Sequence, residues 1–61
     1  MNAKDILRIL KQNGFMQISQ RGSHIKLTKD DKLTIVANHG KKDIPIGTVK
    51  QIEKDTGVKL R

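Results

Sequence analysis

The sequence predicts a small α+β domain in which a helix, a three-stranded antiparallel sheet and a second helix follow one another. Three observations indicate this order. Apolar residues recur at helical spacing near both ends of the chain, they alternate with polar residues in the middle, and turn-forming residues separate the segments. A chain of 61 residues has room for one hydrophobic core. We therefore expect residues 1–61 to form a single domain.

The first helix is predicted over residues 3–13. Asn2 is suited to the N-cap position, and Asn13-Gly14 is typical of a left-handed helix end. Phe15, directly after the glycine, can fold back onto the last turn. Four apolar residues recur on one face of this helix: Ala3, Ile6, Leu7 and Leu10.

The middle of the chain is predicted to form an antiparallel meander of the segments FMQIS, HIKLT and LTIVA, with turns at QRGS and KDDK. In HIKLT, Ile25 and Leu27 alternate with polar residues, so His24 and Lys26 are expected on the face away from the core. Both helices would cover one face of the sheet and leave the other free for binding. In LTIVA we expect three residues to face the core: Leu33, Ile35 and Ala37.

The second helix is expected to begin at Ile44-Pro45, because proline suits the first turn of a helix. Thr56-Gly57 then ends it. Lys41 and Lys42 precede the helix, where ammonium groups and the helix N-terminus both favour phosphate. The apolar positions of this helix recur at intervals of three: Ile46, Val49 and Ile52.

The charge of the chain indicates a polyanionic partner. Thirteen lysines and arginines face six acidic residues, which gives a formal net charge of +7. Small basic domains bind phosphate backbones by counterion release, and their positive potential would attract an acidic protein as well. There is no cysteine for a disulfide or a thiolate metal site. The apolar runs are too short for a membrane span or a signal peptide, so a cytoplasmic location is expected.

Four short motifs follow one another along the chain: Asn13-Gly14-Phe15 after the first helix, Gly22-Ser23-His24 at the second strand, His39 after the third strand, and Gly47-Thr48 opening the second helix. In this order and spacing they resemble the HicA toxins of HicA-HicB toxin-antitoxin modules, and the resemblance covers nearly the whole chain. Two residues depart from the family pattern: Ala37 stands where relatives often carry proline, and Ile25 where a second histidine or an aromatic residue is frequent.

The resemblance implies a fold like the double-stranded RNA-binding domain, a toxin that cleaves mRNA and so inhibits translation, and a HicB-like antitoxin as protein partner. It assigns RNA cleavage to His24. The residue type allows this, because an imidazole titrates near neutral pH and can accept a proton from a ribose 2′-hydroxyl or donate one to the leaving 5′-oxygen. The attacking oxygen belongs to the RNA, so the reaction needs neither a protein nucleophile nor a metal or other cofactor.

Four cations are candidates for binding RNA. Lys26 emerges on the same face as His24, about 6 to 7 Å along the strand, and could neutralise the scissile phosphate. Arg21, in the turn before His24, could hold a phosphate bidentately. Lys41 and Lys42 could contact the backbone beside the second helix. For each of these residues, a solvated surface cation is the competing interpretation.

Three other residues have simpler interpretations than catalysis. Ser23 has no second histidine or acid near it in sequence to activate it as a nucleophile. His39 is expected to bond a loop carbonyl and fix the loop, and two histidines without cysteine disfavour a zinc site. Phe15, the one aromatic residue, is expected in the core. Without an aromatic stacking platform, recognition of RNA should be directed mainly at the backbone.

Two alternatives to a ribonuclease remain open from the sequence. The chain could be a non-catalytic double-stranded RNA-binding module that uses its basic face for affinity alone. Its basic face could instead exist to meet an acidic protein. With an antitoxin as partner, the enzymatic and the protein-binding hypotheses can both hold, because a protein that covered His24 would prevent RNA from reaching it.

Overall fold

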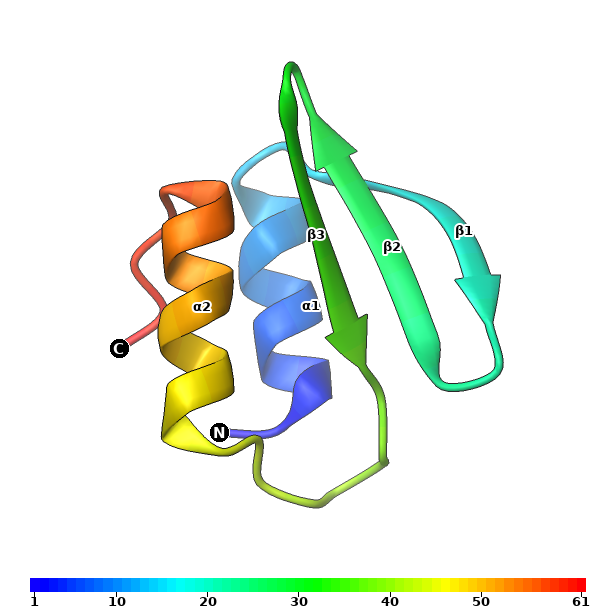
Figure 1. Ribbon diagram of the computed structural model, residues 1–61, viewed down its shortest axis with the longest axis vertical. Coiled ribbons are helices and arrows are strands. Elements are labelled where there is room, and N and C mark those ends of the chain that lie inside the picture. Colours follow the sequence, from blue (N-terminus) through cyan, green and yellow to red (C-terminus); the bar gives the residue numbers. More distant parts are fainter.

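The computed structural model describes residues 1–61 and confirms the predicted order of elements. The elements are α1 (Ala3–Gln12), β1 (Met16–Arg21), β2 (His24–Lys29), β3 (Lys32–Ala37) and α2 (Ile46–Thr56). The strands form one antiparallel sheet in the order β1-β2-β3. In Figure 1, α2 lies at the left, and α1 lies between α2 and β3 and partly behind β3.

Helix α1 is closed at both ends by the residues that predicted its limits. At the start, the backbone N–H of Asp5 donates to Asn2 Oδ1 at 3.0 Å, and the N–H of Asn2 reaches back to the Asp5 carboxylate at 3.5 Å. At the end, Gly14 has a φ of +92°. The N–H of Phe15 then donates to the carbonyl of Leu10 at 3.0 Å, which turns the phenyl ring into the core.

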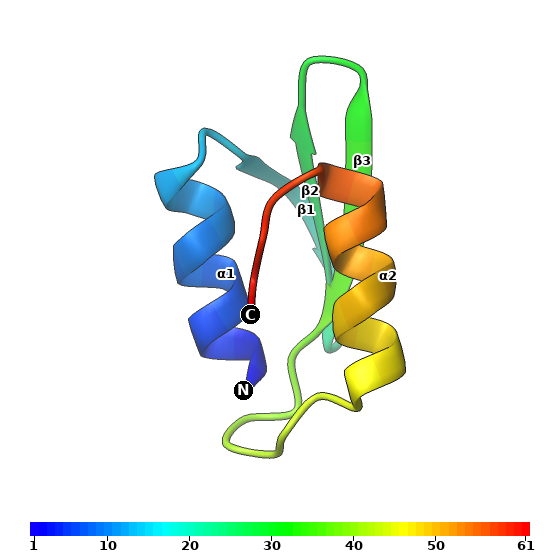
Figure 2. The ribbon, with the colours of Figure 1, turned by 90° about the vertical axis from the view of Figure 1, so that its left-hand side faces the viewer.

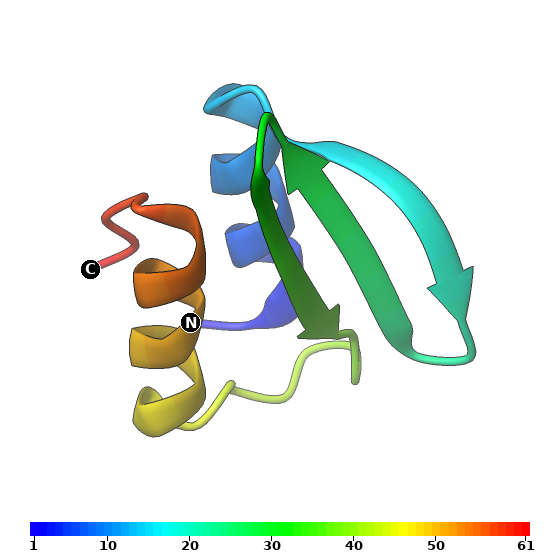
Figure 3. The same ribbon diagram turned by 45° about the horizontal axis from the view of Figure 1, so that its top comes forward.

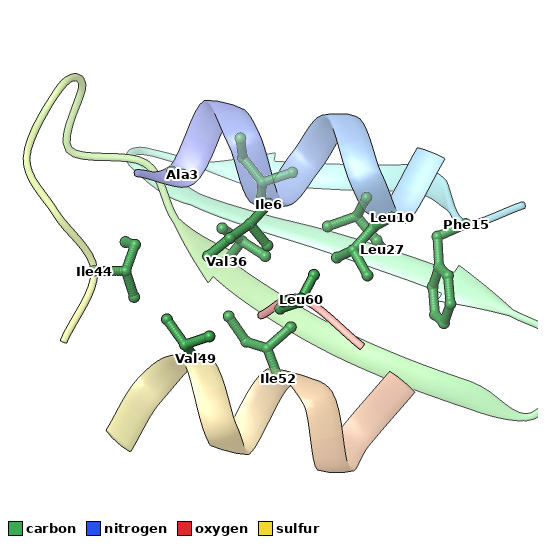
Figure 4. Close-up of a cluster of buried hydrophobic side chains, with 11 residues drawn as sticks. Ala3, Ile6, Leu10, Phe15, Leu27, Val36, Ile44, Val49, Ile52 and Leu60 are labelled. Carbon is green, nitrogen blue, oxygen red and sulfur yellow. The ribbon is translucent and has the colours of Figure 1, made fainter. Parts of the chain in front are cut away.

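The core lies between the two helices and one face of the sheet. Figure 4 shows side chains of α1, β2, β3 and α2 meeting there. β1 contributes no buried residue, so the sheet is covered mainly over its other two strands. Eleven apolar residues are buried: Ala3, Ile6, Leu10, Phe15, Ile25, Leu27, Val36, Ile44, Val49, Ile52 and Leu60.

The face assigned to β3 from its sequence is wrong. Thr34 and Val36 are buried, whereas Leu33 and Ile35 are each 50% exposed. The register explains the difference. The turn between β2 and β3 contains only Asp30 and Asp31, so Ile25 pairs with Val36 and Leu27 pairs with Thr34. Ala37, which was also expected to face the core, pairs with His24 and so shares the opposite face.

The second helix begins slightly later than predicted. Pro45 is the N-cap residue of α2 and lies outside its first turn. Ile46 is 56% exposed, contrary to its expected place on the core face, and Ile44 of the preceding loop is buried instead. After Gly57, the last residues run back between the two helices (Figure 2) and bury Leu60. Neither helix is long and apolar enough to cross a membrane.

Candidate active site

The outer face of the sheet, opposite the helices, is open, and nothing lies in front of it in Figures 1 and 3. His24 is the first residue of β2 and pairs with Arg21 of β1. Lys26 pairs with Ser19 of β1 and with Ile35 of β3. Since directly opposed residues of an antiparallel pair share a face, these side chains all project from the outer face.

A shallow depression of about 520 Å³ lies on this face. It brings together three of the residues singled out from the sequence, His24, Arg21 and Lys26. The lining contains two cations and no carboxylate, so it suits an anion. Six residues line it: Ser19, Gln20, Arg21, His24, Lys26 and Ile35.

The backbone before His24 is fixed, but its ring is free. Gly22 opens the turn with a φ of +59°, and Gln20 Nε2 donates to the Gly22 carbonyl at 3.0 Å. The N–H of Asn38, just after β3, donates to the carbonyl of Ser23 at 2.7 Å. His24 is exposed, and neither of its ring nitrogens makes a hydrogen bond within the protein. Both nitrogens are therefore open to a substrate.

A β-bulge in β1 decides which residue of its first half lies on the outer face. Gln17 pairs with Leu27 and Ser19 with Lys26, so Ile18 is an extra residue on β1. On the side of the turn, Arg21 lies opposite His24 and Ser19 opposite Lys26, so both share the face of His24. Beyond the bulge, Met16 pairs with Thr28 and lies on this face, where a regular ladder continued from the turn would place Gln17. The sequence gives no clear sign of this bulge, and the position of Arg21 beside His24 could be expected only from its place at the turn.

Lys41 and Lys42 are not part of this depression. Both are exposed residues of the loop between β3 and α2. Lys41 lines a second hollow beside α1, and Lys42 lines neither hollow. Asp43, Ile44 and Pro45 separate the two lysines from the first turn of α2. The four cations predicted to bind RNA thus divide between the outer face and the loop.

His39 does not have the structural role expected of it. It is exposed and makes no hydrogen bond to a loop carbonyl. The loop is held by its neighbours instead: Asn38 Oδ1 accepts the N–H of Gly40 at 3.1 Å, and the N–H of Ile44 donates to the carbonyl of Met1 at 2.8 Å. His39 also does not line the depression that contains His24.

Apolar side chains on the outer face are the main feature that the sequence analysis missed. Met16 is 68% exposed, and Leu33 and Ile35 are half exposed. Met16 and Leu33 both pair with Thr28, on either side of β2, while Ile35 pairs with Lys26. The two-residue turn at Asp30-Asp31 was the available signal, because it fixes which β3 residues share a face with His24.

The chemistry available at this face is acid-base catalysis next to positive charge. The Ser23 hydroxyl makes no hydrogen bond to His24, so no activated protein nucleophile is formed. No group of three or more His, Cys, Asp or Glu side chains comes together that could hold a metal ion. An imidazole with two neighbouring cations can transfer a proton while negative charge is stabilised on a bound anion.

Comparison with known proteins found one family. A family model described as the HicA toxin of bacterial toxin-antitoxin matches residues 3–58 of the chain. No curated protein and no solved structure matches it. The matched range includes both helices, all three strands and every residue of the depression on the outer face.

Proposed function

The chain belongs to the HicA toxin family, and from this premise we propose that it is an endoribonuclease that cleaves mRNA and thereby inhibits translation. The observation that carries the proposal is the state of His24. Its ring is exposed at the mouth of a strand, free of internal hydrogen bonds, and shares a depression with Arg21 and Lys26. His39 is equally exposed and unbonded but does not line this depression, so the two neighbouring cations are what distinguish His24.

In the proposed reaction, the ribose 2′-oxygen attacks the adjacent phosphorus, and a ring nitrogen of His24 accepts the 2′-hydroxyl proton. The bond from the 2′-oxygen to phosphorus forms as the bond from phosphorus to the 5′-oxygen breaks. The products are a 2′,3′-cyclic phosphate and a free 5′-hydroxyl. The leaving oxygen takes its proton from water or from the same imidazole, since no second acid-base group lines the depression.

Arg21 and Lys26 have the proposed role of binding the scissile phosphate. Both lie on the same face as His24 and project from neighbouring strands. Negative charge on the phosphoryl oxygens increases as the 2′-oxygen attacks, and cations fixed beside those oxygens stabilise the transition state more than the bound substrate. The planar guanidinium of Arg21 can hold two oxygens at once, whereas Lys26 acts as a point charge.

The partner of a toxin from such a module is an antitoxin, and we infer a HicB-like protein that binds the outer face. Met16 of β1 and Leu33 and Ile35 of β3 give this face exposed apolar side chains on either side of the middle strand, which presents His24 and Lys26. That composition suits a protein surface with apolar side chains and carboxylates. A protein bound there would cover His24 and keep RNA away from it.

The test of the proposed activity is incubation of the purified protein, freed of any partner, with mixed-sequence RNA in EDTA. His24→Ala is compared with His39→Ala, which removes the other exposed histidine, and circular dichroism verifies that both variants are folded. We expect the wild type and His39→Ala to produce fragments ending in a cyclic phosphate and His24→Ala to lose at least about a hundredfold in rate.

Other outcomes would overturn the proposal. If all three proteins bind RNA and none cuts it, the protein is a non-catalytic RNA-binding module. If His24→Ala cuts as fast as the wild type, the catalytic group lies elsewhere. Loss of activity in His39→Ala alone would transfer the acid-base role to the loop after β3.

A further inference from the structure

A second hollow, separate from the candidate active site, lies beside α1. We name it the α1 groove. It has a volume of about 780 Å³ and is formed by one side of α1 and the loop after β3. Leu7 is its only apolar residue. Nine residues line it: Asn2, Lys4, Leu7, Arg8, Lys11, Gln12, Asn38, Gly40 and Lys41.

The cations of the α1 groove form a line. Lys4, Arg8 and Lys11 recur at intervals of four and three residues, so they lie along one side of the helix over about 10 Å. All three are exposed, and Lys41 adds a fourth cation from the facing loop. Two acids lie close to these residues: Asp5, 3.7 Å from the Arg8 guanidinium, and Asp43, which pairs with Asn2. Asp5 also closes the capping box of α1, so it offsets only part of this charge.

The composition of the groove fits a phosphate backbone better than a protein surface. Protein interfaces have an apolar core, which the single Leu7 does not supply. Phosphate contacts are made by lysine, arginine and amide side chains, and these make up most of the lining. The outer face, with its apolar side chains, differs from the groove in this respect.

One end of the α1 groove, at the start of α1, lies at the same end of the molecule as the turn before His24 (Figure 1). In Figures 1 and 2 the turn before β2, the end of β3 and the start of α1 lie toward the same, lower end. Asn38 links the two sites directly: it lines the groove, and its N–H donates to the carbonyl of Ser23, next to His24. A strand leaving His24 can therefore pass around the end of β3 into the groove.

We propose that the α1 groove is a second RNA site, which holds the phosphate backbone of a single strand whose neighbouring segment lies at His24. A single line of cations matches one backbone, and its length of about 10 Å spans roughly two or three phosphates. The site reads no base. It lengthens the stretch of RNA that the protein contacts and so favours long RNA over short fragments. The proposal rests on the proposed function for its ligand, RNA.

The test measures binding without cleavage, in the His24→Ala background. The probe is a fluorescein-labelled single-stranded RNA of 20 nucleotides with mixed sequence, and affinity is followed by anisotropy at several salt concentrations. The groove variant is Lys4→Gln/Arg8→Gln/Lys11→Gln. The control, Lys50→Gln/Lys54→Gln/Lys59→Gln, removes the same charge from exposed residues of α2 and the C-terminal segment. Circular dichroism verifies both folds.

We expect the groove variant to weaken binding of the single strand at least about tenfold and to reduce the slope of log K against log salt by about 2, since each lost phosphate contact removes about 0.7. The control should weaken binding less than about threefold. Equal losses in both variants would overturn the proposal, because net charge alone would then attract RNA. A larger loss for a 20-base-pair duplex than for the single strand would overturn the choice of ligand.

This experiment is independent of catalysis. If wild-type protein fails to cut RNA while the groove variant alone loses affinity for RNA, the proposed nuclease activity is wrong and the groove is still an RNA site. If the wild type cuts RNA and the groove variant binds as well as the control, the nuclease stands and the second site does not exist.

Discussion

Gly22 fixes the direction in which the chain enters β2, and therefore the position of His24. Its φ of +59° is in the left-handed region, yet an added Cβ would meet no atom within 4 Å. Substitution is therefore costly because of the backbone and not because of crowding. An L-residue in this conformation costs about 1–2 kcal/mol, and the turn has no other glycine to take up the strain.

The same substitution at two glycines should change stability in opposite directions. Gly47, in the first turn of α2, also has open space around it and no left-handed φ. Gly22→Ala should lower the free energy of unfolding by about 1–2 kcal/mol, whereas Gly47→Ala should raise it by about 0.5–1 kcal/mol through helix propensity. Urea denaturation followed by circular dichroism measures both. Equal changes would show that space, and not φ, decides the effect at Gly22.

At the residue scale, the sequence predicted the side chains next to clear patterns and missed those that depend on distant contacts. His24 is predicted on the open face because the apolar residues Ile25 and Leu27 alternate with His24 and Lys26. The prediction that His39 fixes the loop was wrong, because Asn38 holds the loop with its own side chain and backbone. A histidine beside an asparagine in a loop gives no signal of which one makes the bonds.

At the element scale, the order of helices and strands was predictable because each boundary has its own local chemistry: the Asn2 cap, the Gly14 stop and the tight turns. The face of β3 was predicted wrongly, because LTIVA is apolar or small at most positions of both alternating sets. Only the pairing register distinguishes them, and the register follows from the turn at Asp30-Asp31. The bulge at Ile18 depends on contacts between strands and has no such local signal.

Glu53 of α2 holds the C-terminal segment. Its carboxylate accepts the N–H of Leu60 at 2.8 Å and that of Arg61 at 3.3 Å, and it pairs with the Arg61 guanidinium at 3.4 Å. The hydrogen bond from Leu60, aided by the contacts with Arg61, holds the pKa of Glu53 below its ordinary value of 4.5 despite partial burial. A lowered pKa in the folded state stabilises the fold above about pH 4.5, and this stabilisation is lost as the carboxylate is protonated at lower pH.

Glu53→Gln should therefore lower Tm at pH 7, and the difference in Tm between the variant and the wild type should be smaller at pH 3. Thermal denaturation at the two pH values measures this difference. Asp31→Asn controls for net charge, since it removes one negative charge from an exposed turn residue that makes no hydrogen bond or ion pair. A gap between wild type and Glu53→Gln that stays constant from pH 7 to pH 3 would contradict the role of the carboxylate charge.

At the scale of the whole molecule, two surfaces differ in composition. The outer face has apolar side chains around a histidine and two cations, and the α1 groove has cations and amides with one apolar residue. Burying apolar area drives most protein association, whereas cations alone suffice for a phosphate backbone. The contrast predicts that the antitoxin binds the outer face and that its affinity depends on the exposed aliphatic residues there.

Substitution of these aliphatic residues should weaken the antitoxin complex. Leu33→Gln and Met16→Gln each replace an exposed apolar side chain on the outer face, outside the depression that contains His24. Each should raise the Kd for the antitoxin about tenfold, because burial of such a side chain contributes about 1.5–3 kcal/mol when it is complete. Ile46→Gln is the matched control, since Ile46 is equally exposed but lies at the start of α2. Calorimetric titration measures all three, and a larger loss for Ile46→Gln than for Leu33→Gln would place the antitoxin on the helical side of the protein.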